Sequence, residues 1–174
     1  MTSSIAITSV TFILVGNMLI TYNNIGVGWT AILTAIFGYI LFFVGLSRLK
    51  TSLDEIGQNG VSKIIWATII GIVALLMSYI PIAGGFLAGI LTIIAFILQI
   101  VGLLKLKKSS SIGLIGANGV NYLLIAMVIM IMTGLFSIIP FVGGPIKSVF
   151  AFVAFLIIPF GWIKIQEGII EKKD

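Results

Sequence analysis

Few side chains of this sequence could do chemistry inside its apolar segments. Asn17 and Gln99 are amides well inside those segments, and no carboxylate or arginine lies near the middle of any of them. The chain has no Cys and no His, which excludes disulfides, thiolate catalysis, His-ligated zinc and bis-His haem. We therefore predict no catalytic residue, no metal and no cofactor, and a protein that is not an enzyme.

The amides of Asn17 and Gln99 have two readings. They could bond across to neighbouring helices and hold them together, or they could line a narrow polar path through the membrane. Pro159 lies within an apolar segment and predicts a helix kink there, because proline removes a backbone hydrogen bond. The kink would either line a cavity or fit the helix to its neighbours.

Two acids lie in a polar stretch, residues 47–63. We expect Asp54 and Glu55 to balance the charges of Arg48, Lys50 and Lys63 rather than to form a site. The same stretch begins with leucines at helical spacing and contains Gly57 and Gly60. It therefore predicts a short interfacial helix that ends at these glycines.

The basic residues lie in the gaps between the apolar segments. The net charge is +5, and nine of the ten Lys/Arg fall on one predicted side of the membrane, with only Lys147 on the other. The positive-inside rule makes the rich side cytoplasmic, so the chain is predicted to be a multi-pass protein of the cell membrane with both termini in the cytoplasm. Because these charges form no basic face, we expect lipid headgroups as their partners and no nucleic acid. The residues predicted to contact headgroups are Arg48, Lys105, Lys107, Lys108 and Lys164.

The composition indicates that the apolar segments lie in a lipid bilayer. The chain of 174 residues is 60% hydrophobic and 9% charged, against roughly 25% charged in soluble domains. Six apolar segments are close to the length of about 20 residues that crosses a bilayer as helix. We predict an all-α integral membrane protein, residues 1–174 forming one transmembrane domain. The six predicted helices are residues 5–22, 29–46, 64–80, 86–104, 120–139 and 146–165.

The six segments form three similar pairs. Residues 24–49 match residues 81–106 at ten of 26 positions, and residues 81–106 match residues 140–165 at seven of 26. The matches include Gly45, Gly102 and Gly161, and Lys105 aligns with Lys164. We predict three tandem helical hairpins inserted in the same direction, which are parallel repeats. The predicted units are residues 1–50, 61–108 and 119–167.

The linkers repeat as well. Residues 56–61 align with residues 115–120, so Asn59 corresponds to Asn118, and we expect both asparagines in left-handed turns. Small residues four apart occur at Gly85 and Gly89 and at Ala67 and Gly71, a pattern typical of closely packed membrane helices. We expect these two patterns to pack helices together within the chain; the alternatives are a contact with a partner or no packing role.

A family resemblance follows from one of these units. The turn Ile80-Pro81-Ile82-Ala83-Gly84-Gly85 and the helix exit Gly102-Leu103-Leu104-Lys105-Leu106-Lys107-Lys108-Ser109 are about twenty residues apart. This pattern, over most of residues 44–120, resembles small multi-pass archaeal membrane proteins grouped as domains of unknown function. The resemblance implies a helical membrane topology and no particular activity. The charged loop typical of that family is replaced here by Ser109-Ser110-Ser111-Ile112-Gly113.

Two functions fit the sequence. The first is an accessory or scaffold subunit that packs against other subunits of a larger membrane complex, such as a respiratory one. It is favoured by the absence of site chemistry and by the uncharged helix faces. The second is a channel or carrier for a small neutral solute or a lipid, favoured by the threefold repeat and by Asn17 and Gln99. A shared cavity between these two amides would favour transport, and a dry centre would favour the scaffold.

Overall fold

Helices dominate the chain. The computed structural model describes residues 2–22, 29–78, 80, 84–136 and 143–172. Within these ranges it contains six long α-helices and one short 3-10 helix, and no strand. The helices are α1 (Thr2–Tyr22), α2 (Trp29–Thr51), α3 (Glu55–Met77), α4 (Gly84–Lys107), η1 (Ser110–Ile112), α5 (Gly113–Phe136) and α6 (Gly143–Glu171).

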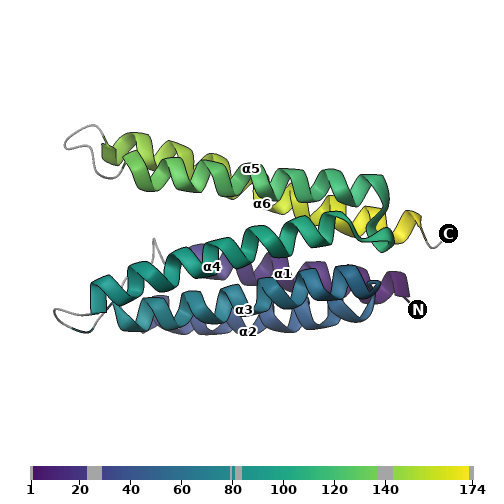
Figure 1. The fold of residues 1–174 in the computed structure, drawn as a ribbon, viewed down its shortest axis with the longest axis horizontal. Coiled ribbons are helices and arrows are strands. Elements are labelled where there is room, and N and C mark those ends of the chain that lie inside the picture. Colours follow the sequence, from purple (N-terminus) through teal and green to yellow (C-terminus); the bar gives the residue numbers. More distant parts are fainter. Residues whose placement is uncertain (1, 23–28, 79, 81–83, 137–142, 173–174) are drawn as a thin grey trace.

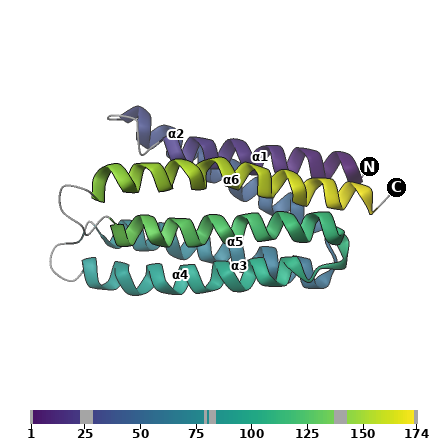
Figure 2. The ribbon, with the colours of Figure 1, turned by 90° about the horizontal axis from the view of Figure 1, so that it is seen from above.

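The long helices pair in chain order. Helix α1 packs mainly against α2, α3 against α4 and α5 against α6 (Figure 1). We call these pairs hairpins A, B and C. Both ends of the chain and the α2–α3 and α4–α5 connections lie at one end of the bundle (Figures 1 and 2), which we call the basic end. An even number of crossings therefore returns the chain to the side on which it began.

The three hairpins close into a ring. Contacts join α2 to α3, α4 to α5 and α6 back to α1. Helices α4 and α5 meet near the basic end and separate toward the other end (Figure 1). The largest fully buried side chains agree with this arrangement, because they lie in the half of the bundle nearer the basic end. They are Ile13, Leu46, Leu49, Ile64, Leu106, Ile112, Ile165 and Ile169.

The outside of the bundle is apolar. Five helices of the described chain are long and hydrophobic enough to cross a membrane, and α1 adds a shorter apolar stretch, Ser4–Ile20. Large side chains such as Phe37, Phe86 and Phe160 are more than half exposed. Water would penalise this surface by about 25 cal/mol for each Å², whereas lipid does not. The chain is therefore a multi-pass membrane protein.

The polar stretch after α2 differs from our expectation. Helix α2 continues to Thr51, and α3 already begins at Glu55 with Asp54 as its N-cap. Gly57 and Gly60 lie inside α3 and do not end a helix, so the predicted interfacial helix is wrong. The cause is tertiary: the backbone at Gly60 packs directly against α4, and this contact outweighs the low helix propensity of glycine.

The second linker shows the same effect. Helix α5 begins at Gly113, which has the positive φ of 57° that glycine tolerates. Asn118 therefore lies within α5 and Asn59 within α3, and the left-handed turns predicted for both are wrong. Helix α6 runs to Glu171, well past the expected end at Ile165.

Glycines bring the helices of each hairpin together. A methyl group added at Gly102 would lie 2.8 Å from the carbonyl oxygen of Gly60. A methyl group added at the aligned Gly161 would lie 2.9 Å from the carbonyl oxygen of Gly119, and one added at Gly45 would lie 2.7 Å from the carbonyl oxygen of Ser9. The three aligned glycines thus occupy the same kind of backbone contact, one in each hairpin.

The patterns of small residues picked out above behave differently. Gly85 and Gly89 are exposed, and a methyl group at Gly71, Gly85 or Gly89 would meet no atom within 4 Å. Only Ala67 of these four residues is buried. The expected packing within the chain is therefore wrong for the three glycines. On α4 the close contact forms at Gly102, on a different side of the helix from Gly85 and Gly89, whereas Gly71 lies on the same side of α3 as Gly60 but has no helix against it.

Candidate functional site

The two amides singled out in the sequence, Asn17 and Gln99, lie on different helices. Asn17 is half-buried on α1 and already has an interaction partner, whereas Gln99 is exposed on α4. Neither residue lines any of the three clefts described below. None of these clefts is the shared cavity that would favour transport.

Helix α6 continues through Pro159. The proline lies near its middle, and the helix extends twelve residues further to Glu171. Since proline has no N–H, the carbonyl of Phe155 loses its normal helical donor there. None of the three clefts is lined by Pro159.

Asp54 joins two connections that are far apart in sequence. Its carboxylate accepts hydrogen bonds from the Ser109 hydroxyl at 2.5 Å, and from the Ser110 backbone N–H and hydroxyl, both at 2.9 Å. It also accepts from the backbone N–H of Gly57 at 2.9 Å, and its own N–H donates to the Ser111 hydroxyl at 2.7 Å. We call this cluster of Asp54 and Ser109–Ser111 the clasp. The clasp ties the start of α3 to the segment between α4 and α5.

The clasp corrects our expectation for Asp54. Its partners are serines and backbone N–H groups, and no ion pair with Arg48, Lys50 or Lys63 exists within the described chain. Burial raises the pKa of Asp54, but the hydrogen bonds from Ser109, Gly57 and Ser110 outweigh burial and lower the pKa to about 2. The signal in the sequence was the pair Asp54-Glu55 directly before an apolar segment, which is typical of a helix start.

Removing the clasp should destabilise the basic end. We expect Asp54→Ala to lower the unfolding free energy by about 1–3 kcal/mol, since it removes an N-cap and leaves buried donors unpaired. Thermal unfolding in detergent, followed by circular dichroism, measures this. Because the folded pKa of about 2 is below the ordinary 3.8, the stabilisation should persist above pH 4 and disappear as the pH falls toward 2.

The neighbouring acid gives a matched control. Glu55 is exposed in the first turn of α3, and Glu55→Gln removes the same charge at a cost of about 0.3–1 kcal/mol. Equal losses for the Asp54 and Glu55 variants would contradict the clasp.

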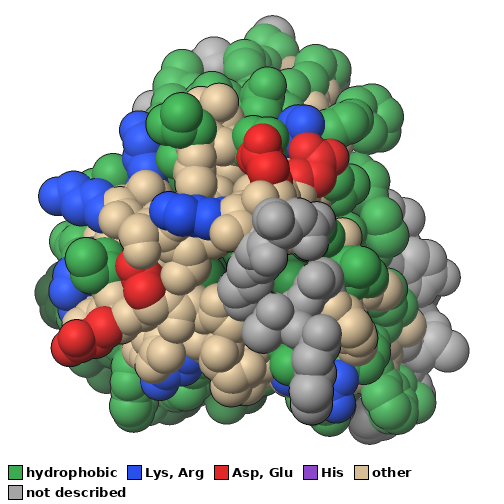
Figure 3. Space-filling model, turned by 90° about the vertical axis from the view of Figure 1, so that its right-hand side faces the viewer, with side chains coloured by type: hydrophobic (Ala, Val, Ile, Leu, Met, Phe, Trp, Pro, Cys, Tyr) green, Lys and Arg blue, Asp and Glu red, His purple; other side chains and the backbone are tan. Residues whose placement is uncertain are grey.

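The basic residues predicted to contact lipid gather at the basic end (Figure 3). Lys107 and Lys108 are exposed there. Three others, at aligned positions, make different contacts: Arg48 lies over the Phe12 ring at 5.3 Å, Lys105 donates to Asn59 at 3.1 Å, and Lys164 pairs with Glu167 at 2.6 Å. Lys147 lies near the start of α6, at the opposite end.

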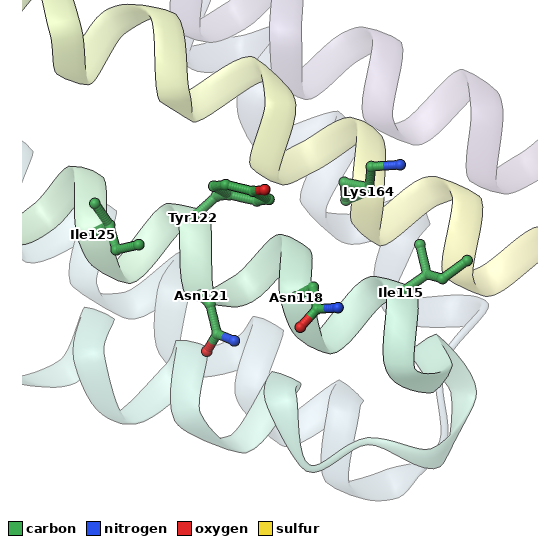
Figure 4. A pocket seen from close by; sticks show the side chains of 6 residues that line it. All are labelled: Ile115, Asn118, Asn121, Tyr122, Ile125 and Lys164. Carbon is green, nitrogen blue, oxygen red and sulfur yellow. The ribbon is translucent and has the colours of Figure 1, made fainter.

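A cleft opens beside Lys164. It measures about 370 Å³ and runs along α5, with Lys164 contributed by α6 (Figure 4). Its lining residues are Ile115, Asn118, Asn121, Tyr122, Ile125 and Lys164. A smaller cleft of about 160 Å³ shares Tyr122 and Lys164 and is otherwise lined by Ile157 and Phe160. Polar donors thus lie directly beside an apolar groove.

The cleft between hairpins A and B is different. A second cleft of about 390 Å³ is lined by side chains of both charges, including Lys50, Glu55 and Lys63. Within the described residues no group of three His, Cys, Asp or Glu side chains could hold a metal ion. The lining residues of the clefts offer hydrogen-bond donors and charge for binding.

Comparison with known proteins adds no assignment. The sequence matches no family model, and no similar protein was found among curated proteins or solved structures.

Proposed function

We propose that the protein is a non-catalytic accessory or scaffold subunit that packs against another membrane protein through α4. The observation that carries this proposal is the position of Gln99. Its side chain is exposed within the membrane-spanning part of α4 and makes no hydrogen bond within the described chain. An amide left unpaired in hydrocarbon costs roughly 2–7 kcal/mol, and a polar group on a neighbouring helix would remove that cost.

The surroundings of Gln99 support a helix as the partner. Gly85, Gly89 and Thr92 are exposed on the same side of α4 as Gln99. Successive residues of this set are four, three and seven positions apart, which are the spacings of one helix face. Thr92 already bonds to the carbonyl of Ala88, which leaves Gln99 as the polar anchor. Exposed glycines let a second helix backbone approach closely, as membrane helix contacts require. We call Gly85, Gly89, Thr92 and Gln99 the α4 face.

The repeat belongs to the same proposal. We infer that hairpins A, B and C are tandem copies of one unit, supported by the equivalent contacts of Gly45, Gly102 and Gly161. Three similar hairpins that contact one another in a closed ring suit a structural role. The orientation with both termini in the cytoplasm is proposed from the charge distribution.

The alternative, a channel or carrier for a small neutral solute or a lipid, gains no support from the polar residues. It needs Asn17 and Gln99 beside one path, but they lie on α1 and α4 and line none of the three clefts.

Gentle purification tests the proposal. The chain would be extracted from its native membranes in a mild detergent, and its complexes would be analysed by mass spectrometry. We expect one or a few membrane subunits at fixed stoichiometry. A chain that purifies alone, or only as copies of itself, would contradict the accessory role.

A further inference from the structure

The cleft beside Lys164 has the features of a site for an amphiphile. One part presents the ammonium group of Lys164 and the amide of Asn118, whereas the amide of Asn121, which also lines the cleft, points away from Lys164 (Figure 4). The adjoining part is lined by Ile157 and Phe160. Tyr122 borders both parts, so its ring could contact a chain while its hydroxyl meets a polar group (Figure 4).

The level of the cleft fits a lipid headgroup. Lys164 lies seven residues before the end of α6 at Glu171, a distance of about 10 Å along a helix. The aligned residue Lys105 lies in the last turn of α4. Both ammonium groups are thus near the boundary where apolar helix surface gives way to the basic end.

Hairpin C differs from the other hairpins at this level. In hairpin B the amide of Asn59 already holds Lys105, and in hairpin A the ring of Phe12 lies under Arg48. In hairpin C, Lys164 turns to Glu167, which leaves Asn118 lining an open cleft. Glu167 takes one of the three donors of the ammonium group, so two donors remain for a ligand.

We propose that this cleft binds an anionic phospholipid, with its phosphate at Lys164 and Asn118 and its chain along Ile157 and Phe160. The net charge of +5 and the gathering of basic residues at this end favour an acidic ligand. The apolar half of the site distinguishes a lipid from free phosphate. This role is independent of the α4 face, because it involves α5 and α6.

Native mass spectrometry of the full chain in detergent tests the site with three probes: phosphatidylglycerol, phosphatidylcholine and inorganic phosphate. We expect phosphatidylglycerol to bind most tightly. Lys164→Gln should weaken it about tenfold, the effect of losing one charge-assisted hydrogen bond. Asn118→Asp should also weaken it by adding a negative charge. Glu167→Gln should strengthen it, because it frees Lys164, and a residue with only a structural role would not give this opposite sign.

Hairpin B supplies the matched controls. Lys105→Gln and Asn59→Asp make the same changes at the aligned positions and should leave the affinity for phosphatidylglycerol unchanged. The proposal would be overturned if phosphatidylcholine bound as tightly as phosphatidylglycerol. It would also be overturned if Lys105→Gln and Lys164→Gln weakened phosphatidylglycerol binding by the same factor. Inorganic phosphate that competed at micromolar concentration would overturn the assignment to a lipid.

Discussion

Replacing Gly60 by leucine is expected to push α3 away from α4 and to lower the unfolding free energy by at least about 2 kcal/mol. A first side-chain carbon at Gly60 would lie 2.7 Å from both the Gly102 carbonyl oxygen and the Leu106 backbone nitrogen. Backbone atoms of a helix cannot turn aside as the end of a flexible side chain can. The two helices must therefore separate, and the packing of Leu106 against its buried neighbours is lost with them.

The same helix contains the control. Gly71 has no atom within 4 Å of the corresponding position, so Gly71→Leu should leave stability unchanged or raise it slightly through better helix propensity. Thermal unfolding in dodecyl maltoside, followed by circular dichroism, compares the two variants. A Gly60 variant as stable as the Gly71 variant would contradict the close approach of α3 and α4.

Replacing Gln99 by leucine is expected to reduce the amount of co-purifying partner about tenfold or more. The substitution removes the hydrogen bond that Gln99 offers to a second helix, and such a bond is worth about 1–2 kcal/mol in membranes. It leaves no cavity in the chain itself. The folded chain itself should tolerate the change, because Gln99 is exposed. Quantitative mass spectrometry of the purified complex measures the ratio of partner to chain.

A neighbouring position on α4 controls for hydrophobic change alone. Ile97 is 54% exposed on a different side of the helix, so Ile97→Leu should retain the partner. Loss of the partner in both variants would mean that no particular side of α4 is recognised. Retention in both would mean that Gln99 takes no part in recognition.

The sequence was informative wherever length and hydrophobicity decide the structure. It predicted six apolar helices and the polar connections between their pairs, because a bilayer requires long continuous apolar segments. The role of the glycines at helix contacts was harder to predict from the sequence. Gly57 and Gly60 looked like helix breakers, yet Gly60 lies inside α3, since its missing side chain allows α4 to approach. Propensity describes an isolated helix and contains no information about the neighbour.

The faces of the helices could not be predicted. In a helix that is apolar all round, hydrophobic periodicity does not separate the lipid side from the packed side. Gly89 and Gly60 therefore look alike in the sequence, although one is exposed and the other lies against Gly102. The clasp was missed for a different reason: Asp54 and Ser109 are 55 residues apart, and only the fold brings them together.

The aligned lysines Lys105 and Lys164 make different contacts, which their alignment does not predict. Lys105 and Lys164 match in the sequence, and so do Asn59 and Asn118. The structure gives the two pairs different contacts, because Glu167 draws the Lys164 ammonium group away in hairpin C. A repeat can therefore preserve a residue while its immediate surroundings diverge.

Cross-linking through single cysteines in native membranes tests the docking of α4 most directly. The chain contains no cysteine, so each introduced thiol is the only one in the chain. A cysteine at Gly89 should cross-link to another polypeptide, whereas one at Gly71 on α3 should not. Equal cross-linking at the two positions, cross-links only between copies of this chain, or none at Gly89 would contradict the proposal that α4 holds a partner subunit.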